Sequence, residues 1–118
     1  LFLPGGMPGT RNLAACGKLE NMLEDAAKEG RRLAAICAAP SVLGRLGLPI
    51  GKRATCFPGY ESLLRGAEYT GEGVVTDGNV TTARGLGYAL DLGLELLALL
   101  TTKDNAAHVK SAIQYDRV

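Results

Sequence analysis

A cysteine at the end of a buried apolar run is the residue best suited to chemistry in this sequence. The segment reads Ala34-Ala35-Ile36-Cys37-Ala38-Ala39-Pro40-Ser41. It predicts a strand over residues 32–36, a sharp turn at Cys37 and a helix from about Pro40 to Leu46. The free N–H groups and partial positive charge of a helix start stabilise a thiolate. Cys37 is therefore a candidate nucleophile or redox sensor. The alternative is a small buried hydrophobic residue at a strand end.

A loop rich in glycine and proline is the second candidate. It reads Pro4-Gly5-Gly6-Met7-Pro8-Gly9 and follows a short apolar strand at residues 1–3. In open α/β sheets, ligands bind at the carboxyl ends of strands, and this loop and Cys37 both lie at such ends. The Gly6 N–H and the N–H groups after Cys37 could together hold an oxyanion, a hydrated carbonyl or an oxidised sulfur. By itself, such a loop is more often only a turn.

A base for the thiol is not evident in this sequence. The one histidine, His108, falls in a predicted terminal helix, where we expect it at the surface. Glu61, Glu68 and Glu72 lie in polar segments and are expected to be solvated. A nucleophilic cysteine normally needs a base, so a Cys–His hydrolase is not supported.

Charge and cysteine usage narrow the class of protein. The 118 residues carry a net charge of +1, which argues against nucleic acid or an anionic membrane as the main partner. The apolar run over residues 92–100 contains Glu95 and is too short to span a bilayer. Cys16 and Cys56 are assigned structural roles. Three irregularly spaced cysteines predict neither a disulfide framework nor a metal site, which favours a reducing, cytoplasmic setting.

The alternation of strands and helices predicts one α/β domain over residues 1–118. Asp77-Gly78 suits the tight turn of a hairpin that would extend or decorate the sheet. The first residues resemble a buried strand rather than a free terminus, so we expect the C-terminal portion of a longer protein. The remaining predicted elements are helices over 18–28, 85–101 and 103–114, a strand over 52–56, helical turns over 60–65, and hairpin strands over 74–76 and 79–82.

These motifs together resemble the ThiJ/PfpI superfamily, and within it the clade of the Parkinsonism-associated protein deglycase. The resemblance rests on Leu3-Pro4-Gly5-Gly6, on the Cys37 segment, and on Asp77-Gly78-Asn79 through Arg84-Gly85. It implies a flavodoxin-like three-layer α/β sandwich, akin to class I glutamine amidotransferases. It also implies an upstream β-α-β region, absent here, that carries a protonated glutamate bonded to the nucleophilic thiol.

Position by position, the resemblance assigns roles around Cys37, which matches the nucleophile-elbow cysteine. The backbone groups of Gly5, Gly6 and Ala38 match the surrounding anion-binding loop. Ala38 stands where the protease-like branch has histidine, which disfavours peptidase activity. This sequence departs from the family pattern at two further places and offers one more candidate binding residue. Phe57 precedes Pro58 where some relatives have a pocket histidine, Gly85-Leu86-Gly87 replaces Gly-Pro-Gly, and Arg84 could bind an anion or a neighbouring subunit or simply be solvated.

The function that this resemblance implies is cysteine-dependent protection against small reactive carbonyls. Cys37 would attack methylglyoxal-like compounds in a glyoxalase or deglycase reaction that needs no metal or organic cofactor. The implied partner is a second copy, or a separate chain carrying the missing region and its glutamate. The alternative is a redox sensor or chaperone in which Cys37 is oxidised to sulfinic acid. A structural domain with an inert cysteine is the third reading.

Overall fold

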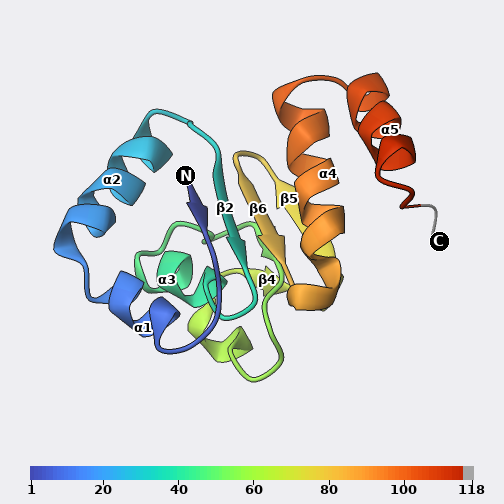
Figure 1. The fold of residues 1–118 in the computed structure, drawn as a ribbon. Coiled ribbons are helices and arrows are strands. Elements are labelled where there is room, and N and C mark those ends of the chain that lie inside the picture. The colour runs from blue at the N-terminus through green and yellow to red at the C-terminus, as the bar shows by residue number, and fades with distance from the viewer. Residues whose placement is uncertain (116–118) are drawn as a thin grey trace.

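Four strands form a mixed sheet in a computed structural model that describes residues 1–115 (Figure 1). The strands are β1 (Phe2–Leu3), β2 (Leu33–Ile36), β5 (Val74–Asp77) and β6 (Val80–Ala83), in the order β1-β2-β6-β5. β1, β2 and β6 run parallel, and β5 pairs antiparallel with β6. The predicted hairpin thus extends the parallel layer, and Gly78 takes the positive φ of 60° that its turn requires.

Strand β2 is buried at all four of its residues, as expected for a central parallel strand covered on both faces. Its side chains alternate between the two faces. Leu33 and Ala35 contribute to one hydrophobic core, whereas Ile36 belongs to the core on the opposite face. Because β2 lies between β1 and β6, its carboxyl end at Ile36 is fixed near the middle of the sheet.

Helices cover both faces of this sheet, which confirms the three-layer α/β sandwich (Figure 1). On one side lie α1 (Gly9–Ala14), α2 (Gly17–Lys28) and α3 (Pro40–Arg45). On the other side α4 (Ala89–Leu100) packs Leu92 against Ile36 and Ala83, and α5 (Lys103–Ala112) packs on α4. None of the helices in residues 1–115 is long and apolar enough to cross a membrane.

Several predicted boundaries were wrong, and two elements were not predicted. The strand over 52–56 is only β3 (Arg53–Ala54), which pairs with an unpredicted β4 (Glu68–Tyr69) in a separate two-stranded sheet. The turns over 60–65 reduce to one 3-10 turn, η1 (Glu61–Leu63). The helix over 85–101 begins with a 3-10 turn, η2 (Leu86–Tyr88), before α4. α1 was not predicted.

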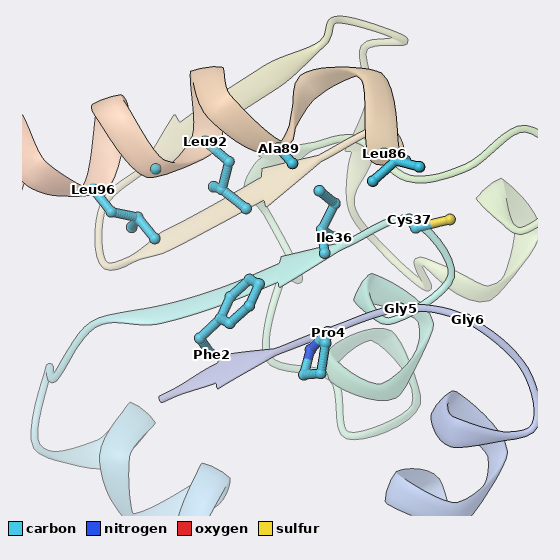
Figure 2. Close-up of a pocket in the computed structure, with 11 residues that line it drawn as sticks. Phe2, Pro4, Gly5, Gly6, Ile36, Cys37, Leu86, Ala89, Leu92 and Leu96 are labelled. Atoms are coloured by element: carbon cyan, nitrogen blue, oxygen red, sulfur yellow. The ribbon is translucent and has the colours of Figure 1, made fainter. Parts of the chain in front are cut away.

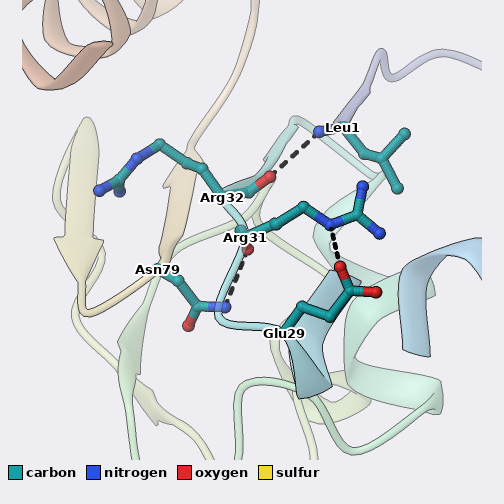
Figure 3. A network of polar contacts seen from close by, with 5 residues as sticks. All are labelled: Leu1, Glu29, Arg31, Arg32 and Asn79. Carbon is teal, nitrogen blue, oxygen red and sulfur yellow. Dashed lines mark hydrogen bonds and ion pairs between the residues drawn. The ribbon is translucent and has the colours of Figure 1, made fainter. Parts of the chain in front are cut away.

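Polar contacts join the strands at the end of the sheet opposite the candidate site (Figure 3). The Leu1 ammonium donates to the Arg32 carbonyl at 3.0 Å, and the Asn79 side-chain amide donates to the Arg31 carbonyl at 3.0 Å. Arg31 also forms an exposed ion pair with Glu29, and such pairs contribute little stability. The contacts to the Arg31 and Arg32 carbonyls therefore join the segments that lead into β1, β2 and β6 at this end.

Candidate functional site

Three neighbouring parallel strands deliver the candidate residues to one edge of the sheet. β1 ends before Pro4 and Gly5, β2 ends before Cys37, and β6 ends before Arg84 and Gly85. These are carboxyl ends, where open α/β sheets bind ligands. The structure therefore brings the glycine loop and the cysteine together, as the sequence predicts.

Cys37 lies in the left-handed backbone region, with a φ of 65°. A non-glycine residue rarely adopts this conformation, because its backbone is strained there. Two backbone hydrogen bonds hold the turn in place. The Cys37 N–H donates to the Ala83 carbonyl at 2.9 Å, and the Phe57 N–H donates to the Cys37 carbonyl at 2.8 Å. The fold thus imposes a strained strand-to-helix turn at the cysteine.

Gly5 lies directly against this turn, so it must lack a side chain. A Cβ placed on Gly5 would lie 2.6 Å from the Cys37 Cβ and 2.8 Å from the Ile36 carbonyl oxygen. Both distances are shorter than packed atoms tolerate, and neither neighbour is the flexible end of a side chain. The glycine loop therefore approaches the cysteine as closely as the backbone permits.

Two N–H groups beside Cys37 are available to a ligand. Within residues 1–115, neither the Gly6 nor the Ala38 N–H donates to another group of the chain. An N–H group without a partner in the chain is free to donate to a ligand, so two such donors flanking one thiol form an arrangement that suits an oxyanion. Ala38 is buried, while Gly6 is exposed at the mouth of the site.

An apolar cavity of about 630 Å³ opens next to the thiol (Figure 2). Gly5, Gly6 and Cys37 form one end of it, and α4 forms the opposite wall. Apart from Cys37, no residue of the described chain that lines it has a polar side chain. The remaining lining residues are Phe2, Pro4, Ile36, Leu86, Ala89, Leu92, Gly93 and Leu96.

Phe57, Pro58, Arg84 and Gly85 line a different hollow, of about 300 Å³. A hydrogen bond joins the backbone segments that line the two hollows, because the Phe57 N–H donates to the Cys37 carbonyl. Arg84 is half-buried, and its guanidinium donates to the Gly71 carbonyl at 3.5 Å. The structure therefore groups these four predicted residues together, but outside the cavity of Cys37.

The other cysteines occupy the positions that the sequence suggests. Cys16 is exposed at the N-cap of α2. Cys56 is fully buried, and this burial, together with the nearby Glu61 and Cys37, raises the pKa of its thiol to about 11 from 9.0. A thiol held in its protonated form is a poor nucleophile, which suits a structural role for Cys56.

The candidate bases are solvent-exposed. His108 is exposed on α5, and the side chains of Glu61, Glu68 and Glu72 are exposed as predicted. Within residues 1–115 no group of three His, Cys, Asp or Glu residues could hold a metal ion.

The wall of the cavity on α4 was not predicted as part of the site. Ala89, Leu92, Gly93 and Leu96 follow the spacing i, i+3, i+4 and i+7, which places them on one helix face. This spacing could have identified the face from sequence, although not the cysteine opposite it.

A cysteine in a strained turn at the carboxyl edge of the sheet, with unpaired backbone N–H groups beside it, defines the candidate site of a flavodoxin-like α/β protein. Comparison with known proteins specifies the class. The chain belongs to the DJ-1/PfpI family, whose model matches residues 1–99. The predicted resemblance and fold are therefore confirmed.

Three relatives show how similar this chain is to known proteins and what share of their length it covers. It is 38% identical to protein DJ-1 homolog A of Arabidopsis thaliana, over 96% of this chain and 30% of that protein. It is 32% identical to the glutathione-independent glyoxalase DJR-1.2 of Caenorhabditis elegans, over 85% of this chain and 54% of that protein. The crystal structure of Drosophila melanogaster DJ-1beta superposes with a TM-score of 0.90 at 30% identity, over 98% of this chain and 63% of that one. The chain thus spans less than two thirds of each.

Proposed function

We propose that this chain acts on small reactive carbonyl compounds through Cys37, in a glyoxalase-type reaction. The observation that carries the proposal is the strained Cys37 turn, flanked by two unpaired N–H groups at the end of an apolar cavity. The similarity to a glutathione-independent glyoxalase supports the same chemistry. Stress protection through carbonyl removal follows as the role of the protein.

The reaction begins with addition of the Cys37 thiolate to the aldehyde carbon of a 2-oxoaldehyde. A C–S bond forms, the C=O π bond breaks, and the oxygen takes a proton to give a hemithioacetal. The Gly6 and Ala38 N–H groups are placed to stabilise the charge that develops on that oxygen. Transfer of the proton on the former aldehyde carbon to the neighbouring carbon, and of the hydroxyl proton to the neighbouring oxygen, gives a thioester. Water then adds to the thioester carbonyl, the C–S bond breaks, and a 2-hydroxy acid and the free thiol are released.

The group that moves this proton is proposed to lie on another polypeptide segment. Cys37 has the one titratable side chain among the cavity-lining residues of the described chain. β1 is an edge strand in residues 1–115, and the relatives above are all longer than this chain. Both facts support a segment that pairs with β1 and supplies the glutamate that the family resemblance implies. A homodimer and a cytoplasmic location complete the proposal. Native mass spectrometry tests the association, because a lone 118-residue chain would contradict it.

A redox sensor or chaperone is the second candidate, and the two free amides favour it as well. Two molecules of peroxide would convert the Cys37 thiolate first to a sulfenate and then to a sulfinate, releasing two molecules of water. The sulfinate oxygens would accept hydrogen bonds from Gly6 and Ala38.

Methylglyoxal consumption separates the two functions. The wild-type chain, assayed together with the glutamate-bearing segment proposed above, should consume methylglyoxal, and the Cys37→Ser variant in the same assembly should not. Cys16→Ser is the matched control, since Cys16 is exposed at the N-cap of α2, and it should retain activity. Undiminished consumption by the Cys37 variant, or none by the wild type, would contradict the glyoxalase proposal.

A further inference from the structure

Arg84 is a half-buried cation without a counter-ion, and it lines the hollow of about 300 Å³ at the end of β6. Within residues 1–115 it forms no ion pair, and its one side-chain hydrogen bond goes to the Gly71 carbonyl at 3.5 Å. This long bond leaves the other guanidinium N–H donors without a partner in that part of the chain. A cation that is partly removed from water gains free energy when an anion binds beside it.

The loop before β5 holds the residues of this hollow in place. The backbone N–H of Arg84 donates to the Gly73 carbonyl at 2.9 Å, so its backbone and its side chain are both bonded to residues 71–73. A Cβ on Gly73 would overlap the Tyr88 ring, which shows that this ring packs directly on the same loop. A site that is arranged before its ligand arrives loses less entropy on binding.

The hollow at Arg84 is separate from the place of the segment proposed to complete the Cys37 site. That segment is proposed to pair with β1, whereas Arg84 follows β6, and β2 lies between these two strands. None of the described residues that line the cavity of Cys37 also lines this hollow. The carboxyl end of a parallel strand is the usual ligand-binding side of an open α/β sheet, and about 300 Å³ is the lower end of the size range of small-molecule sites.

The walls of the hollow indicate which kind of anion it suits. Phe57 is 47% exposed and Tyr88 is 37% exposed, so an apolar or aromatic group can cover both rings. The other lining residues of the described chain, Pro58, Gly85 and Gly87, carry no charge. One cation in uncharged surroundings suits a ligand with a single negative charge better than a phosphate group, which carries more.

We propose that this hollow binds a small organic carboxylate. The carboxylate accepts hydrogen bonds from the Arg84 guanidinium, and the apolar part of the ligand lies against Phe57 and Tyr88. The site does not depend on the chemistry proposed for Cys37.

Calorimetric titration with benzoate tests this site, using the chain together with any segment that purifies with it. Benzamide has the same shape without the charge, so it should bind at least about tenfold more weakly than benzoate. Arg84→Gln should weaken benzoate binding by about the same factor. Arg53→Gln is the matched control, because Arg53 also donates to a backbone carbonyl, that of Thr76 at 3.4 Å, but is exposed and does not line the hollow. It removes the same charge and should leave the affinity for benzoate unchanged.

The comparison of benzoate with benzamide uses the wild-type chain, so it decides the question even where a variant fails to fold. Equal affinities for the two compounds, or no binding of benzoate, would overturn the proposal. An unchanged affinity for benzoate in a folded Arg84→Gln variant would overturn it as well. If Arg84→Gln changes the oligomeric state and the wild type does not bind benzoate, Arg84 is a contact between copies of the chain instead. Because no turnover is measured, a failure of the glyoxalase proposal leaves this result unaffected.

Discussion

Glycine normally makes a folded protein less stable than alanine does, but the strain at Cys37 predicts the opposite order at this position. Alanine at a φ of 65° keeps the left-handed backbone cost of about 1–2 kcal/mol, whereas glycine does not pay it. Glycine loses more conformational entropy on folding than alanine, which lowers the free energy of unfolding by about 0.5–1 kcal/mol and offsets part of the strain that glycine relieves. The free energy of unfolding of Cys37→Gly should therefore exceed that of Cys37→Ala by about 0.5 kcal/mol.

Ala39 provides the matched control two residues away. It has a helical φ of −66° and is fully buried, so Ala39→Gly should lower the free energy of unfolding by about 1–2 kcal/mol. Urea unfolding of all four proteins measures these differences, with the m-value checked for constancy. If Cys37→Gly is less stable than Cys37→Ala by 1 kcal/mol or more, then the turn is not strained and the reasoning is refuted.

Two further predictions concern the packing around the site. Gly5→Ala should lower the free energy of unfolding by about 1–3 kcal/mol through overpacking and slow the alkylation of Cys37, while Gly9→Ala, whose Cβ would meet nothing within 4 Å, should change neither. Equal stability of the two variants in urea would contradict the close approach. Cys56 predicts a pH effect, because its pKa of about 11 in the folded chain lies above the ordinary 9.0. The unfolded chain loses this proton first, so stability should fall as the pH rises from 9 to 11. Urea unfolding at pH 8 and pH 10.5 should show a fall about 2 kcal/mol greater in the wild type than in Cys56→Ala, and equal falls would contradict the raised pKa.

The part of the site formed by strand ends could be predicted from the sequence. The apolar run before Cys37 identifies a central strand, and parallel strands place their carboxyl ends at one edge. Local patterns therefore located both Cys37 and the glycine loop. The positive φ of Cys37 is not a local property, since hydrogen bonds to Ala83 and from Phe57 impose it.

The elements that were missed depend on contacts distant in sequence. α1 begins with Gly9, Thr10, Arg11 and Asn12, which include poor helix formers, and its later residues Leu13 and Ala14 pack against the hydrophobic core. β4 consists of two exposed residues, so it has no hydrophobic alternation to detect. α4 packs Leu92 against the sheet and also lines the cavity, and sequence spacing alone does not show that one apolar helix face does both.

The central claim is that the fold makes Cys37 the reactive nucleophile of this chain, and competition between its own cysteines tests that claim directly. The wild-type chain is treated with a limiting amount of iodoacetamide, and peptide mapping measures the rate at each thiol. Cys37 should be alkylated first although it is half-buried, ahead of the exposed Cys16, while the buried Cys56 should react last. Alkylation of Cys16 at the same rate as Cys37, or faster, would contradict the claim.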